Sequence, residues 1–187
     1  MKTKTASSKW RMENGLILFE VTSDGTTAPA WIEKTEKLSK IGVMAKNMLR
    51  AKQDPNNSSK PYFKPTKGVK YQVAVMLGSD VADVDRSLGN IRIRADQHKL
   101  FTPPIELACL IPHYLEVSGI KEMGLRRIIT MHDPFGDSEG NWFITAGSLI
   151  LLGSDIDHSA LETFWGDPQY RCLYRNDGFA FLLNQVS

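Results

Sequence analysis

The stretch Gly15-Leu16-Ile17-Leu18-Phe19-Glu20-Val21-Thr22 decides the fold class of this 187-residue chain. Its side chains alternate between two faces, one fully apolar and the other mostly apolar, which predicts a buried β-strand. The turn-forming residues 23–27 follow it and indicate a change of direction. A helix is expected after this turn because Thr26 or Thr27 can cap one, and Pro29 is tolerated in a first helical turn.

Residues 30–53 have the strongest helical pattern in the chain. Apolar side chains recur on one stripe at helical spacing, at Trp31, Leu38, Ile41, Ala45, Met48 and Leu49. Gly42 lies inside this stretch and can kink or split the helix. The polar cluster 54–59 ends the helix, and a polar loop runs on to Lys70.

The remaining elements are shorter. Alternation predicts strands over 70–77 and 125–132, and residues 80–98 are expected to be helical in part. An apolar helix should run from Pro103 to Ile111 and end or kink at Pro112, because proline removes a backbone donor. A short helix capped by Ser118 should stop at Gly124 in the left-handed conformation. Three short apolar runs make the last third β-rich: 142–145, 148–152 and 179–183.

This order of elements differs from a regular βαβ series. It predicts one α+β domain, in which one long helix and several short helices pack on a mixed or antiparallel sheet. We expect residues 14–187 to form this single domain and residues 1–13 to be a flexible basic tail, because the tail is rich in Ser, Thr and Lys and has no periodicity.

Composition favours a chain that folds without disulfides or a structural metal. The sequence is 42% hydrophobic and 24% charged, close to the globular average. Its two cysteines, Cys109 and Cys172, belong to no C-x-x-C pair and are predicted to be buried thiols. The sequence has no secretory pattern and no apolar run long enough to span a bilayer, so we expect a cytoplasmic protein without membrane association.

Charge is distributed unevenly along the chain. Residues 1–70 contain 14 Lys and Arg against 6 Asp and Glu, whereas residues 71–187 contain 9 against 15. Such asymmetry can mark a surface for an anionic macromolecule in the basic N-terminal part. It is equally explained by a solvated helix with a basic tail.

A short basic segment carries a nucleic-acid hypothesis. Lysines and aromatic residues interleave there, at Lys60, Tyr62, Phe63, Lys64 and Lys67. Aromatic rings that stack on bases beside lysines that face phosphates would have this pattern. A polar loop that packs two aromatic residues into the core would have it too, and no known RNA- or DNA-binding motif supports the first interpretation.

A metal-dependent hydrolase is the alternative that involves catalysis. A strand that ends in His132 and Asp133 enters a loop with Asp137, and these three are the candidate catalytic residues. A divalent metal, the one cofactor considered, would be held by His132, Asp137, Asp155 and His158. The sequence has no H-E-x-x-H or other fixed ligand spacing, and Gly, Asp and Pro in these segments also simply form turns.

Several segments together resemble a group of short bacterial proteins of unknown function. They are the residues 22–27, 63–69 and 106–111, the Met131-His132 loop, and 178–181. The resemblance implies a bacterial, single-domain protein and brings no activity or site residue with it.

We therefore predict a non-enzymatic binding or interaction module for an anionic or macromolecular partner, because the sequence lacks a specific catalytic constellation. The hydrolase and the nucleic-acid-binding protein stay open as alternatives.

Overall fold

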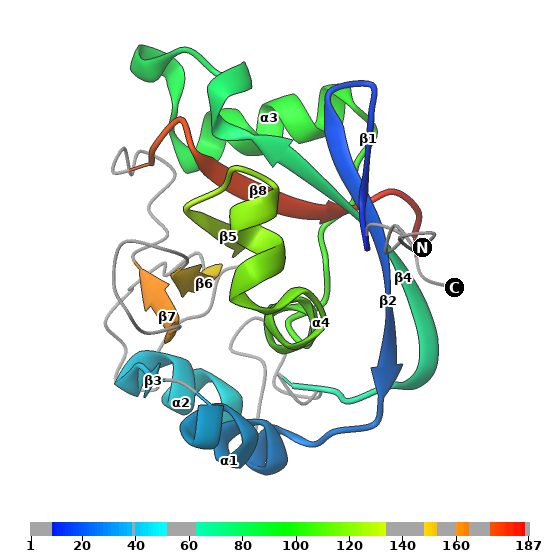
Figure 1. Cartoon of the computed structure of the whole chain (residues 1–187), viewed down its shortest axis with the longest axis vertical. Coiled ribbons are helices and arrows are strands. Elements are labelled where there is room, and N and C mark those ends of the chain that lie inside the picture. The colour runs from blue at the N-terminus through cyan, green and yellow to red at the C-terminus, as the bar shows by residue number, and fades with distance from the viewer. Residues whose placement is uncertain are drawn as a thin grey trace, which may run out of the picture.

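The computed structural model describes residues 9–38, 40–51, 63–133, 148–152, 160–164 and 173–185. These residues form the expected α+β architecture around one mixed sheet (Figure 1). Within them the sheet has eight strands, in the spatial order β1 (Arg11–Glu13), β2 (Leu16–Asp24), β4 (Lys67–Leu77), β8 (Asp177–Leu182), β5 (Arg127–Thr130), β6 (Ser148–Leu152), β7 (Ala160–Phe164) and β3 (Lys40–Ile41).

Four α-helices occur in the same residues: α1 (Ala28–Leu38), α2 (Val43–Arg50), α3 (Leu88–Gln97) and α4 (Leu107–Glu122). Two single 3-10 turns, η1 (Gly78–Asp80) and η2 (Asp83–Asp85), connect β4 to α3. None of these helices is both long enough and apolar enough to cross a bilayer.

Most neighbouring strands are antiparallel, and β2 with β4 forms the longest ladder, from Leu16 opposite Met76 to Asp24 opposite Lys67. The pairs β5–β8 and β3–β7 are parallel, which makes the sheet mixed. Strand β8, close to the C-terminus, lies between β4 and β5 and so joins the two halves of the sheet.

The sheet is covered by helices on both faces, which explains why β2 is apolar on both sides. Ile17 and Phe19 belong to a core shared with α1, α2 and α4. Leu18 points to the opposite face and belongs to a second core shared with α3. Side chains of successive strand residues point to opposite faces, so one strand serves both cores.

The helix predicted over residues 30–53 is split into two helices, and the second begins directly after Gly42. Gly42 has an extended backbone (φ −65°, ψ 152°) and stands immediately before α2, while the short strand β3 separates α2 from α1. In α4 the break lies at Glu116 (φ 58°, ψ 175°) and not at Pro112, which is accommodated inside the helix. Gly124 has a φ of 71° and follows the helix end, as predicted.

Strands β1, β3 and β7 were not anticipated. Arg11–Glu13 pairs with β2, so the last part of the predicted tail belongs to the sheet. Asn14 and Gly15 connect the two strands and both have positive φ, of 51° and 78°. An Asn-Gly pair in this conformation forms the tight turn that suits a two-residue hairpin. The predicted strand at 142–145 lies outside the described residues.

Candidate functional site

His132 follows β5 and is buried, with 2% of its surface exposed. Its Nδ1 lies 2.8 Å from the carbonyl oxygen of Asp133, and because a carbonyl can only accept, Nδ1 carries the proton. Nε2 is then a bare acceptor, and it has no hydrogen-bond partner among the described residues. Burial, and secondarily the nearby positive charge of Arg92, lower the pKa of His132 to about 4, so the imidazole is neutral at pH 7.

In this geometry His132 is not paired with the Asp133 carboxylate, and Asp137, the other predicted partner, lies outside the described residues. The side chain of Asp133 is exposed, and the backbone carbonyl of the same residue orients the imidazole instead. Arg92 fixes the segment from the other side, because its Nη2 donates to the carbonyl oxygen of His132 at 2.7 Å. The Asp133 carbonyl and the Arg92 guanidinium therefore hold the histidine, and neither is a carboxylate that could orient a base.

The other predicted metal ligands, Asp137, Asp155 and His158, lie outside the described residues. Across the described ranges, no three His, Cys, Asp or Glu side chains gather closely enough to hold a metal ion. The metal site therefore stays a prediction, with His132 as its one placed member.

The predicted nucleic-acid segment is divided by the fold. Phe63 is buried in the first core with 7% of its surface exposed, so its ring cannot stack on a base unless the core opens. For Phe63 this placement is that of the second interpretation, a loop that packs aromatic residues into the core. Lys64 and Lys67 are exposed, whereas Lys60 and Tyr62 lie outside the described residues.

Several lysines of the basic N-terminal part are paired locally where the structure describes it. Ion pairs join Lys34 to Asp24 at 3.3 Å, Lys37 to Glu33 at 2.6 Å, Lys46 to Glu36 at 2.6 Å and Lys70 to Glu20 at 3.0 Å. Exposed pairs of this kind contribute little to stability, but they lower the net positive field of the surface. Part of the charge asymmetry is therefore offset by local ion pairs on these elements.

A pocket of about 710 Å³ lies at the end of the sheet where β4 ends and β5 and β8 begin. We call it the Arg86 pocket. Its polar lining includes Ser79, Asp83, Arg86, Arg175 and Asn176, and its apolar lining includes Leu77, Met123, Leu125 and Leu173. The volume falls in the range of about 300–1,000 Å³ that is typical of small-molecule sites.

Gly78 makes the close packing of this region possible. A Cβ at this position would lie 2.3 Å from the carbonyl oxygen of Tyr174 and 3.1 Å from that of Asp177. The turn 174–177 is closed by a hydrogen bond from the Asp177 N–H to the Tyr174 carbonyl at 3.0 Å. The glycine thus lets this turn rest directly on the end of β4, and residues of both segments line the pocket.

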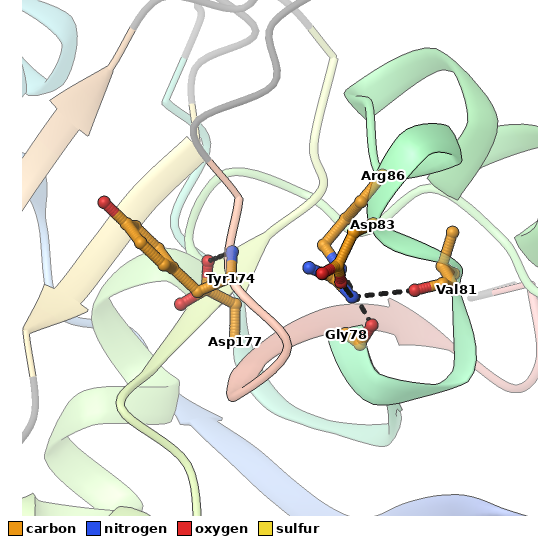
Figure 2. A network of polar contacts seen from close by, with 6 residues as sticks. All are labelled: Gly78, Val81, Asp83, Arg86, Tyr174 and Asp177. Atoms are coloured by element: carbon orange, nitrogen blue, oxygen red, sulfur yellow. Dashed lines mark hydrogen bonds and ion pairs between the residues drawn. The ribbon is translucent and has the colours of Figure 1, made fainter.

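Arg86 is 6% exposed and is held by three acceptors. Its Nε donates to the Gly78 carbonyl at 2.9 Å, and its Nη2 donates to the Val81 carbonyl at 2.8 Å and to the Asp83 carboxylate at 2.6 Å. Nη1 makes no hydrogen bond with the described residues. Figure 2 shows a guanidinium nitrogen without dashed lines on the side that faces the Tyr174–Asp177 turn.

The facing turn is anchored by a buried ion pair. Asp177 has no exposed surface, and its carboxylate accepts from Nε and Nη2 of Arg127 at 2.8 and 2.7 Å. The same carboxylate accepts the Tyr174 N–H at 2.8 Å. The Arg126 guanidinium lies 4.5 Å from the centroid of the Tyr174 ring, and Figure 2 shows that ring directed away from Arg86. These contacts therefore anchor both ends of the turn.

A second buried polar cluster joins β2, β4 and the start of α4. Glu106 is 3% exposed, and its carboxylate accepts from the Thr66 N–H, the Thr66 hydroxyl and the Tyr71 hydroxyl. Burial and the adjacent Glu106 raise the pKa of Tyr71, which stays protonated. Burial also raises the pKa of Cys109, so this thiol is protonated and inert, as predicted for a core cysteine. The cluster fastens elements together and presents no free group to solvent.

Sequence reasoning missed the Arg86 pocket. Arg86 follows three residues of an acidic stretch, Asp83-Val84-Asp85, and directly precedes Ser87, whose hydroxyl accepts the Asn90 N–H at the start of α3. A lone arginine before a helix cap is an ordinary pattern. Arg86 is singled out by the hydrogen-bond acceptors on the β4–α3 connection that hold its guanidinium, and residue spacing in the sequence does not predict them.

No known protein family, no curated protein and no solved structure matches the chain. The resemblance to short bacterial proteins stays a prediction, and the functional argument rests on the geometry of the sites.

Proposed function

We propose that the protein is a non-enzymatic binding module that takes an anionic ligand into the Arg86 pocket. One observation carries the proposal: Arg86, which is 6% exposed, keeps the guanidinium nitrogen Nη1 without a partner among the described residues, at the wall of a pocket of ligand size. Arginine cannot lose its charge in a protein, so an unused donor there favours an anion.

The donor is also held in place before any ligand arrives. The two carbonyl groups and the Asp83 carboxylate fix the plane of the guanidinium through Nε and Nη2. A side chain that is already ordered loses little further entropy on binding, which favours affinity. Arg175 lines the same pocket, is exposed, and adds a second positive charge.

The pocket is better suited to binding than to acid–base chemistry. Its one acidic side chain, Asp83, is engaged by Arg86, and its other charged groups are arginines. A general base needs a free proton acceptor near the reacting group. The lining residues that the structure describes therefore offer recognition groups, with hydroxyl and amide donors from Ser79 and Asn176.

Two-dimensional ¹H–¹⁵N NMR with carboxylates from acetate to octanoate, sulfate and phosphate tests the proposal. We expect saturable shifts at residues 174–176 and at the Arg86 Nε–H, with affinity reduced in Arg175→Gln. Arg94→Gln is the matched control, because Arg94 is an exposed arginine on α3 that does not line the pocket. Saturable binding that leaves residues 174–176 unchanged, or no binding of any of these anions, overturns the proposal.

A metal-dependent hydrolase is the second candidate, and one observation favours it. The unpartnered Nε2 of His132 has its lone pair available while Nδ1 carries the proton, which is the state that a metal ligand needs. Zinc or manganese should then copurify with the protein and be lost in His132→Ala, whereas Asp133→Asn retains it. A Zn²⁺ titration that leaves the Nε2 resonance of His132 unchanged in the wild-type chain removes this candidate. For either function we propose a cytoplasmic location.

A further inference from the structure

We infer that the Arg86 pocket selects a monocarboxylate attached to an apolar body, in preference to phosphate esters and other polyanions. The inference rests on the proposed function, because it specifies the chemical class of the anion. It follows from the balance of charge in the pocket wall, from the one free edge of the guanidinium, and from the apolar side chains beside it.

The charge balance of the wall suits a single negative charge. Asp83 offsets the charge of Arg86 through the 2.6 Å ion pair. Asp177, which anchors the facing turn, is likewise paired with Arg127 at 2.7 Å. Arg175 is then the one lining residue whose charge is not offset by an ion pair with the described residues. A monoanion would be neutralised by one net positive charge, whereas a dianion would keep an uncompensated charge in a partly desolvated site.

The Arg86 guanidinium offers a ligand one free nitrogen, Nη1, and not a pair of nitrogens that could bind two oxygens in parallel. Dianionic phosphate groups are best recognised when two parallel N–H donors of an arginine reach two oxygens. In Arg86, Nε and Nη2 are already used by Gly78, Val81 and Asp83. Nη1 can satisfy one carboxylate oxygen, and Ser79 and Asn176 in the same lining offer hydroxyl and amide donors for the second.

The apolar lining indicates what the carboxylate is attached to. Leu125 and Leu173 are each 5% exposed, and they belong to the first and the second core respectively. Leu77 and Met123 are half-buried and complete this part of the wall. An aliphatic or aromatic body against these side chains would remove apolar surface from water on both partners, which favours binding. Methionine adapts its shape to irregular ligands.

Four probes of graded chemistry test the inference by isothermal titration calorimetry at constant ionic strength: octanoate, octanol, acetate and octyl phosphate. We expect octanoate to bind at least about tenfold more tightly than each of the others, a difference of about 1.4 kcal/mol. Met123→Ser should weaken octanoate binding severalfold and leave acetate unchanged. Arg94→Gln should change neither, because Arg94 lies outside the pocket.

The outcomes separate the inference from the proposed function. Binding of octyl phosphate or of acetate as tight as that of octanoate, or tighter, overturns the monocarboxylate inference and leaves an anion site in place. Octanol binding as tight as octanoate shows an apolar site and overturns both. If none of the four probes binds in the calorimeter and none changes the NMR signals of residues 174–176, the inference and the proposed function are both overturned. Because Arg175 and Met123 are not buried, these variants should fold normally.

Discussion

The protonation state of a single side chain in this protein depends on the groups that surround its polar atoms. His132 is the sharpest case, because its imidazole is buried and neutral with a pKa of about 4, below the ordinary 6.5. Below pH 6.5 the unfolded chain binds a proton at this residue and the folded chain does not, so protonation favours unfolding. The free energy of unfolding contributed by His132 is thus fully present above pH 6.5 and is lost as the pH falls toward 4.

This residue therefore predicts an acid-sensitive fold. Urea denaturation across this pH range should show the free energy of unfolding falling by roughly 3 kcal/mol through His132 alone, at about 1.4 kcal/mol per pH unit. His132→Leu should remove that part of the slope, whereas His98→Leu, at an exposed histidine, should keep it. A slope that is the same in all three proteins would show that His132 titrates normally.

Gly78 predicts a second effect at the residue scale. Gly78→Ala would place a Cβ 2.3 Å from the Tyr174 carbonyl oxygen, so the 174–177 turn must shift, and we expect a loss of about 2–3 kcal/mol. In Gly119→Ala the nearest atom is the Leu115 Cβ at 3.5 Å, an ordinary contact. This control should leave stability unchanged or raise it by up to about 1 kcal/mol, because alanine favours a helix. Thermal unfolding of both variants makes the comparison, and equal melting temperatures would contradict it.

At the scale of elements, α4 contains one residue, Glu116, whose backbone conformation is unfavourable for any residue other than glycine. Glu116 adopts φ 58° and ψ 175°, a region that glycine occupies at far lower cost than other residues. Glu116→Gly should therefore raise the free energy of unfolding by about 1 kcal/mol, measured by urea denaturation. Lys121→Gly, in the regular part of the same helix, should lower it by about 1 kcal/mol. Destabilisation by both variants would mean that Glu116 is not strained in solution.

The elements also show how much of the fold follows from local pattern. The strand at Gly15–Thr22 and the break at Gly42 were predictable, because alternation and a glycine within a helix act over a few residues. The Asn14-Gly15 pair is typical of a tight hairpin turn, but the polar, aperiodic residues before it favoured a flexible tail. Arg86 was not predictable, because two of its acceptors are carbonyl groups placed by the chain turns after β4. The buried position of Phe63 likewise depends on packing between distant elements.

At the scale of the whole molecule, one sheet separates two cores, so the cores should unfold together. Adjacent residues of β5 belong to different cores, Ile128 to the first and Ile129 to the second. A core that lost its packing would expose one face of the same strands that the other core needs, which favours a single cooperative transition. Methyl NMR signals of these two isoleucines therefore report each face separately.

Ile91→Ala tests this coupling from one side. Ile91 lies on α3, has no exposed surface and packs only in the second core, so its truncation should cost about 2–5 kcal/mol. If the sheet couples the cores, the Ile128 and Ile129 methyl signals should shift to a lower urea midpoint together, with an unchanged slope. Ile93→Ala is the matched control, because Ile93 is 57% exposed on the same helix and should leave both midpoints in place. A midpoint that falls for Ile129 alone would show that the two faces of the sheet unfold independently.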